Sequence, residues 1–266
     1  MKVLSYYSIK NGDVKKEHLI EHVQVMINLL SNFEETRAYK FGGLLCRSLN
    51  LNPVDFKSSL VQAVVLHDVG KAFYRQHLPK HIKEGHLSFP GHEVISAVIT
   101  WYAMERLVIK QVSPFSSFMK PVVFSILYHH HAMDIKKRLN SVRRLRNLSD
   151  AVNDLKEYLE ELGNFIPKAL INKLVEVLEE IEKENCWILV RKIRRKFEGE
   201  IEGKIWKTFI SSDVKSQVQK KLSLLMLSCL ISLDYIAASK LRDLNISTTF
   251  GKIIEEFYKI YCYLPS

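Results

Sequence analysis

The sequence predicts an all-α protein with a short strand or extended arm at its N-terminus. Apolar residues recur at three- and four-residue intervals through most of the 266 residues, which is the pattern of amphipathic helices. Residues 2–9 alternate weakly between apolar and polar, and Asn11, Gly12 and Asp13 after them are typical of a turn. Hydrophobic content of 47% with 26% charged residues is ordinary for a folded soluble protein.

Amphipathic and apolar segments follow one another along the chain. Helices are expected at about residues 15–30, 34–49, 53–69, from 91 onward, 121–133, 214–241 and 253–263. A loop over residues 72–90 is long for a connection between packed helices, and long loops are often functional. Basic runs and acidic helix faces fill residues 136–207, which we expect to form a charged helical elaboration of a single domain spanning 1–266.

The apolar run LVQAVVLHDVG, at the end of the third expected helix, is the most informative stretch. Its residues should be buried, so they carry His67 and Asp68 into the interior, and Gly70 is the expected helix stop. An ionised carboxylate there costs several kcal/mol unless it is paired or binds a metal. Asp234 is a second carboxylate embedded among leucines and isoleucines.

Charge and segment composition limit the class of protein. The formal charge of +10 favours an anionic partner, most commonly nucleic acid. No run of about 18 uncharged apolar residues and no signal peptide are evident, so we expect no membrane span and a cytoplasmic location. The four cysteines lie far apart without paired spacing, which favours reduced thiols over a disulfide framework.

Several residues with metal-ligating side chains fall on the buried sides or ends of five expected helices. A lone histidine on an apolar face is usually a satisfied core residue, so the inference depends on the whole set. Imidazoles and carboxylates bind divalent cations, and facing helices commonly hold such sites. Seven ligands exceed what one tetrahedral zinc needs, which favours two metals that share a carboxylate. The seven are His22, His67, Asp68, His92, His129, His130 and Asp234.

The order of these residues resembles the HD superfamily of metal-dependent phosphohydrolases. The motifs are LIEHV at His22, LHDVGK at His67, FPGHEVISA at His92, ILYHHH at His129 and LISLDYIAAS at Asp234. Within the superfamily they resemble the HD nuclease of type I CRISPR interference systems. The chain contains no Walker A glycine loop and is too short for a helicase, so it is similar to the stand-alone nuclease subunit.

The resemblance implies an HD-domain helical bundle with the metal site between helices. One metal would be held by His22, His67, Asp68 and Asp234, and the second by Asp68, His92, His129 and His130. Asp68 would bridge the two ions, and Lys71 would neutralise charge that develops on the phosphate.

The resemblance also implies an activity and partners. The protein would be an endonuclease or exonuclease of antiviral defence that cleaves single-stranded DNA with Mn2+, Mg2+, Co2+, Ni2+ or Fe2+. Its partners would be a separate superfamily 2 helicase and the CRISPR RNA-guided surveillance complex.

Several alternatives stay open on the sequence. The paired ligands are His129 and His130 or, in the other register, His130 and His131; the apolar register before the run favours the first. The basic runs are either solvated helix faces or a nucleic-acid surface, with the candidates Arg143, Arg144, Arg146, Arg191, Lys192, Arg194 and Arg195. Other functions are a phosphohydrolase for nucleotides or cyclic nucleotides, and a helical module that binds nucleic acid or a partner without catalysis.

Overall fold

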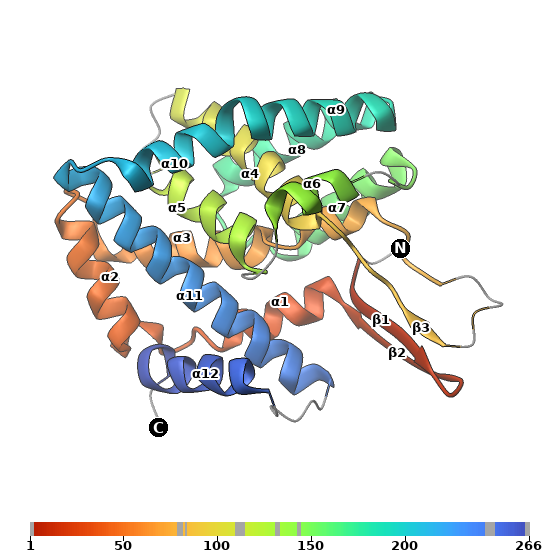
Figure 1. Ribbon diagram of the computed structural model, residues 1–266, viewed down its shortest axis with the longest axis horizontal. Coiled ribbons are helices and arrows are strands. Elements are labelled where there is room, and N and C mark those ends of the chain that lie inside the picture. Colours follow the sequence, from red (N-terminus) through yellow and green to blue (C-terminus); the bar gives the residue numbers. More distant parts are fainter. Residues whose placement is uncertain are drawn as a thin grey trace.

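The computed structural model describes residues 3–78, 82, 84–109, 115–130, 134–142, 145–242 and 248–263. Helices make up most of this part of the chain, and a small antiparallel sheet projects from one end of the helical body (Figure 1). The predicted mostly α-helical fold with a short N-terminal strand arm is confirmed.

The sheet has the order β2-β1-β3, formed by β1 (Leu4–Lys10), β2 (Asp13–His18) and β3 (Gly85–His86). Asn11 and Gly12 join the first two strands, both with positive φ, as a two-residue hairpin turn requires. The prediction of a helix from residue 15 was wrong at its start, because residues 15–18 pair with β1 as a strand. The helix α1 (Leu19–Asn28) begins only where this pairing ends.

The next helices are α2 (Arg37–Arg47) and α3 (Pro53–Leu66), which pack against each other. Asn52 caps α3 by accepting a hydrogen bond from the Val54 amide. After α3 a 3-10 helix, η2 (Val69–Phe73), carries the chain to the long loop.

Gly70 lies inside η2, so its prediction as a helix stop was wrong: α3 already ends at Leu66. Its small size has a different reason. A Cβ atom on Gly70 would lie 2.1 Å from the carbonyl oxygen of His92, and the Gly70 amide donates a hydrogen bond to Ser96 Oγ at 2.8 Å. Gly70 therefore lets η2 pack directly on the start of the following helix.

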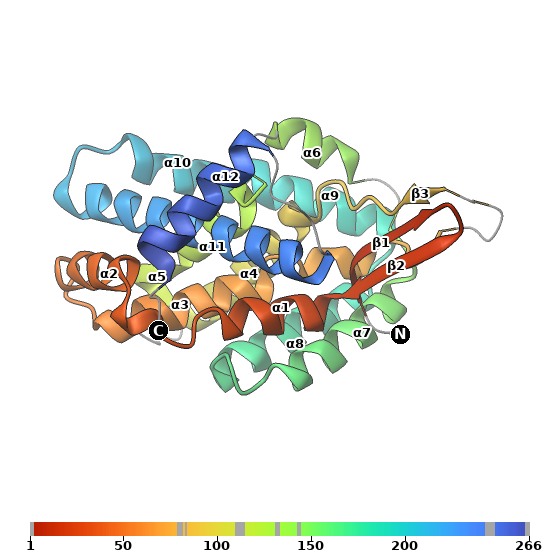
Figure 2. The same ribbon diagram turned by 90° about the horizontal axis from the view of Figure 1, so that it is seen from below.

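Three long helices form the centre of the body (Figure 2). They are α4 (His92–Ile109), α5 (Phe115–Tyr128) and α11 (Val214–Arg242), and α5 packs against both of the others. The start of α5 was predicted at Pro121, but this proline lies within the helix. By length and composition α11 could also span a membrane, a test that buried core helices of soluble proteins pass equally well.

The charged segment folds into a series of helices. Its elements are α6 (Ile135–Ser141), α7 (Leu148–Glu161), α8 (Lys168–Glu182), α9 (Cys186–Lys196), the π-helical turn η3 (Phe197–Ile201) and α10 (Glu202–Ile210). Of these, α8, α9 and η3 pack against α4, α7 packs against α8, and α10 packs against α11. The chain closes with α12 (Thr249–Phe257) and η4 (Tyr258–Cys262), which lie against α11. Apolar side chains from both halves of the chain share one buried cluster.

Candidate metal centre

The structure brings all seven predicted ligand residues together from five helices. His22 lies in α1, His67 and Asp68 directly follow α3, and His92 is the first residue of α4. His129 and His130 directly follow α5, and Asp234 lies in α11. Most of these positions are helix ends, where a side chain can reach into the space between packed helices.

Three of the histidines have the same local hydrogen bond. Nδ1 of His67 donates to the Val64 carbonyl at 2.8 Å, and Nδ1 of His129 donates to the Ile126 carbonyl at 2.6 Å. His92 makes the equivalent bond to the carbonyl of Phe89, also at 2.6 Å. Because Nδ1 carries the proton in each neutral ring, the lone pair is on Nε2. Each ring is therefore fixed as a potential metal ligand through Nε2.

The potential ligand atoms form two groups, each with its atoms within 4.8 Å of one another. The groups are His22, His67 and Asp234, and Asp68, His92, His129 and His130. In the first, Asp234 Oδ1 lies 2.9 Å from His22 Nε2 and 3.9 Å from His67 Nε2.

Asp68 lies between the two groups. Its Oδ1 lies 2.7 Å from Nε2 of His92, and its Oδ2 lies 3.3 Å from Nε2 of His67. One oxygen of this carboxylate therefore faces each group.

In the second group the electrostatics favour an ionised Asp68 and neutral rings of His92 and His130. His129 differs, because burial would lower its pKa but the hydrogen bond and charge of Asp68 outweigh burial and raise it. Burial alone would raise the pKa of Asp68, but the charges of His67, Lys71 and His92 outweigh it and hold the pKa well below its usual range. Burial lowers the pKa of His92 and that of His130, the latter also because of the charges on His129 and His92. This is the protonation state in which both residue types bind cations.

Several of these buried atoms lack a hydrogen-bond partner among the described residues. They include Nε2 of His67, Nε2 of His129 and Oδ1 of Asp68. Leaving buried polar atoms unpaired costs about 1–3 kcal/mol each, more for a charged group. A cation placed among them would satisfy these atoms at once. The cluster of histidine and aspartate side chains could therefore hold a metal ion, and its donor chemistry fits one.

Glu17 is a partner of His22 that sequence reasoning missed. Its Oε1 lies 2.9 Å from His22 Nδ1, on the side of the ring opposite Asp234. Burial lowers the pKa of His22, but hydrogen bonds to Asp234 and Glu17 outweigh this effect and raise it to about 9. Arg242 in turn donates to both oxygens of Glu17, at 2.7 and 3.2 Å. No sequence spacing points to Glu17, because it lies in β2 and reaches His22 only through the hairpin's packing.

Lys71 is buried beside the cluster, rather than exposed after a helix stop. Its Nζ lies 2.5 Å from Oδ2 of Asp68 and donates to the carbonyl of Ser5 at 3.2 Å. A second missed contact is the pair of Glu93 and Arg138, joined by two hydrogen bonds of 2.6 and 2.7 Å directly beside His92. These contacts fix the surroundings of both Asp68 and His92.

The predicted nucleic-acid residues differ in their surroundings, and four of them lie on α9. Arg146 is engaged inside the protein, where it donates to the Ala72 carbonyl and pairs with Asp154. Lys192 pairs with Glu184, and Arg194 donates to the Leu139 carbonyl. Arg191 and Arg195 are exposed on α9. Arg143, Arg144 and the alternative ligand His131 lie outside the described residues.

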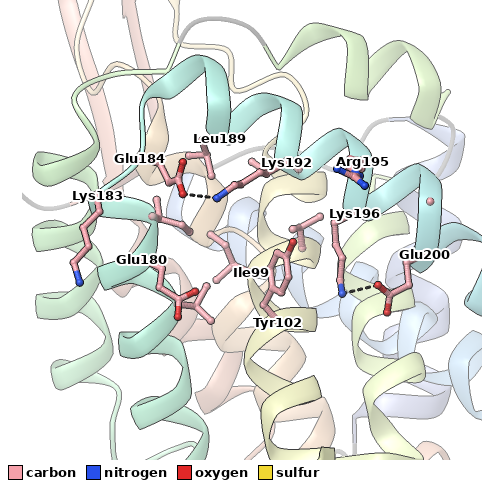
Figure 3. A pocket seen from close by; sticks show the side chains of 15 residues that line it. Ile99, Tyr102, Glu180, Lys183, Glu184, Leu189, Lys192, Arg195, Lys196 and Glu200 are labelled. Carbon is pink, nitrogen blue, oxygen red and sulfur yellow. Dashed lines mark hydrogen bonds and ion pairs between the residues drawn. The ribbon is translucent and has the colours of Figure 1, made fainter.

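Two cavities are relevant to the site. One of about 260 Å³ reaches the cluster and is lined by Ser5, Lys71, His130, Asp234, Tyr235, Ala238, Ser239 and Arg242. The other, of about 700 Å³, lies between α4, α8 and α9, with charged side chains around an apolar floor (Figure 3). The larger one includes no residue of the cluster, whereas His130 and Asp234 line the smaller one.

No protein-family model, curated protein or solved structure matches the chain.

Proposed function

We propose that this protein is a divalent-metal-dependent hydrolase that cleaves phosphodiester bonds of single-stranded DNA. The observation that carries the proposal is the position of the Asp68 carboxylate, with one oxygen toward His67 and the other toward His92 and His129. A carboxylate between two ligand groups is what a two-metal phosphodiesterase needs. The order of the HD-superfamily motifs is a second, independent support.

His22, His67, Asp68 and Asp234 would hold one ion, and Asp68, His92, His129 and His130 the other. The mixture of imidazole and carboxylate ligands suits Mn2+, Fe2+, Co2+ or Ni2+, and Mg2+ is the hard-cation alternative. When bound, such ions lower the pKa of a coordinated water and stabilise charge on the phosphate.

Residues of the protein itself would position the metal ligands and the substrate phosphate. The backbone hydrogen bonds of His67, His92 and His129 hold the ligand rings at fixed angles, so little reorganisation is needed on binding. Lys71 lies at the cavity wall next to Asp68, where its ammonium group can pair with a phosphate oxygen of the substrate. The net charge of +10 supports a polymeric anion over a free nucleotide.

The wider role we propose is CRISPR interference in the cytoplasm. A separate superfamily 2 helicase would supply the unwound strand at the RNA-guided surveillance complex. In this proposal residues 1–266 form one HD nuclease domain, with the helical elaboration at about 136–207.

A nuclease assay tests the proposal directly. Purified protein with Mn2+, Mg2+, Co2+, Ni2+ or Fe2+ should degrade labelled single-stranded DNA, and Asp68→Ala should not. Hydrolysis of nucleotides or cyclic nucleotides without strand cleavage would favour the phosphohydrolase alternative. Absence of bound metal after reconstitution, measured by elemental analysis, would favour a non-catalytic binding module.

A further inference from the structure

Two sets of residues line the cavity at the C-terminal end of α11. One set consists of the cluster residues His130 and Asp234 together with Lys71. The other set, which we call the outer wall, includes Ser5 from β1 and Tyr235, Ser239 and Arg242 from α11. Any strand whose phosphate reaches Asp68 through this cavity must place the neighbouring part of its chain against the outer wall.

Arg242 is held in place but keeps donor capacity. Its Nε and Nη2 donate to Glu17, and its guanidinium lies 4.3 Å from the centroid of the Tyr6 ring. Among the described residues, Nη1 has no hydrogen-bond partner. A guanidinium fixed by stacking and by one carboxylate loses little entropy when it binds a phosphate.

Two other outer-wall groups also lack partners within the described part of the chain. The buried hydroxyl of Ser5 makes no hydrogen bond, which is unfavourable unless a ligand supplies one. Tyr235, next to Asp234, is half-buried and lines the cavity, and among the described residues it has no aromatic neighbour and no hydrogen bond. Part of its side chain is therefore accessible from the cavity, beside a residue of the cluster.

We infer that this outer wall is a nucleotide subsite, in which Tyr235 stacks on an unpaired base and Arg242 binds the phosphate of the same nucleotide. The inference rests on the proposed function and deepens it. The volume of about 260 Å³ lies just below the usual range of small-molecule sites, so it leaves room for no more than one nucleotide unit at a time. A base in a duplex has both faces stacked, so the subsite selects single strands.

The test compares two oligonucleotides of equal length and charge. One is oligothymidylate, and the other has the same backbone with abasic tetrahydrofuran residues. Stacking of one base on an aromatic side chain contributes about 1–3 kcal/mol. We therefore expect wild-type protein with Mn2+ to cleave the thymidine strand with about tenfold higher kcat/KM.

Variants of Tyr235 test whether its ring causes the preference for the thymidine strand. In Tyr235→Leu the ratio of the two kcat/KM values should fall to about one, whereas Tyr235→Phe, which keeps the ring, should retain it. Tyr261→Leu is a matched control, because Tyr261 is 42% exposed on η4 and stacks on Phe257 away from the cavity lining. It should retain the ratio.

The outcomes separate the subsite from the function it rests on. A ratio of one in the wild type, or an unchanged ratio in Tyr235→Leu, overturns the subsite while strand cleavage still supports the nuclease. A wild type that cleaves neither strand overturns the nuclease proposal and the subsite with it. If Tyr235→Leu is too weak for kinetics, the ratio of dissociation constants for the two strands, by fluorescence anisotropy, replaces kcat/KM.

Discussion

The cluster of histidine and aspartate side chains and the groove between α4, α8 and α9 are both rich in polar side chains, but these side chains are paired in the groove and partly unpaired in the cluster. In the groove Glu184 pairs with Lys192, and Glu200 pairs with Lys196 at 2.6 Å (Figure 3). These charges are near water and already neutralise one another. In the cluster, His67 and Asp68 are buried and keep atoms without hydrogen-bond partners among the described residues. Polar groups that a fold buries without pairing them indicate a ligand, whereas paired surface charges do not.

The largest expected difference between the two regions comes from removing one carboxylate from each. Asp68→Asn keeps the shape but removes the charge that both ligand groups share, so nuclease activity should fall by a factor on the order of 10³ or more. Glu184→Gln, the matched change in the groove, should retain full activity. Cleavage rates of labelled single-stranded DNA measure both. Equal losses in the two variants would contradict the distinction.

Metal affinity should depend steeply on pH. Because the pKa of His22 is raised to about 9, this ring is protonated at neutral pH in the metal-free protein and must lose its proton before it binds. Affinity should therefore rise with pH, by about tenfold per unit for one released proton, and level off near pH 9. Titration calorimetry with Mn2+ between pH 7 and 9 measures it; an affinity independent of pH would exclude His22 from the ligand set.

Glu17 tests whether a hydrogen-bond partner of His22 affects metal binding, because its Oε1 lies 2.9 Å from His22 Nδ1. Glu17→Gln should weaken Mn2+ affinity by about 10- to 100-fold, the usual effect of losing a partner of a ligand histidine. Calorimetry at pH 8 gives the affinity, and thermal unfolding of the metal-free variant controls for folding. Wild-type affinity in a folded variant would show that Glu17 does not orient His22.

Gly70→Ala tests the close backbone contact that Gly70, two residues after Asp68, makes with His92. The added Cβ would meet the His92 carbonyl at 2.1 Å, so the segment must shift. Overpacking of this kind costs about 1–3 kcal/mol of the free energy of unfolding. Gly199→Ala is a control, because a Cβ there would meet no atom of the described residues within 4 Å. Urea denaturation should show a lower midpoint for Gly70→Ala than for this control.

The spacing of apolar residues was sufficient to predict most helices, because an apolar stripe at helical spacing marks the buried face of a helix. This spacing gave a wrong prediction where a partner elsewhere in the fold decided the conformation. Residues 15–18 have a helix-compatible pattern but form a strand, because β1 pairs with them. Gly70 looked like a helix stop, but its small size is needed for contact with a carbonyl 22 residues later in the chain, as the numbers of the two residues show.

The sequence by itself determined the mostly α-helical fold and the candidate ligand residues, because helix periodicity and side-chain chemistry are local properties. Only the tertiary structure decided that the seven side chains share one space and that Asp68 faces both groups. It also assigned Glu17 to His22, Arg138 to Glu93 and Arg146 to the interior. Glu93 and Arg138 lie 45 residues apart, and Glu17 and His22, although close in sequence, belong to a strand and a helix whose relative placement is set by packing. Such contacts leave no local pattern in the residues involved.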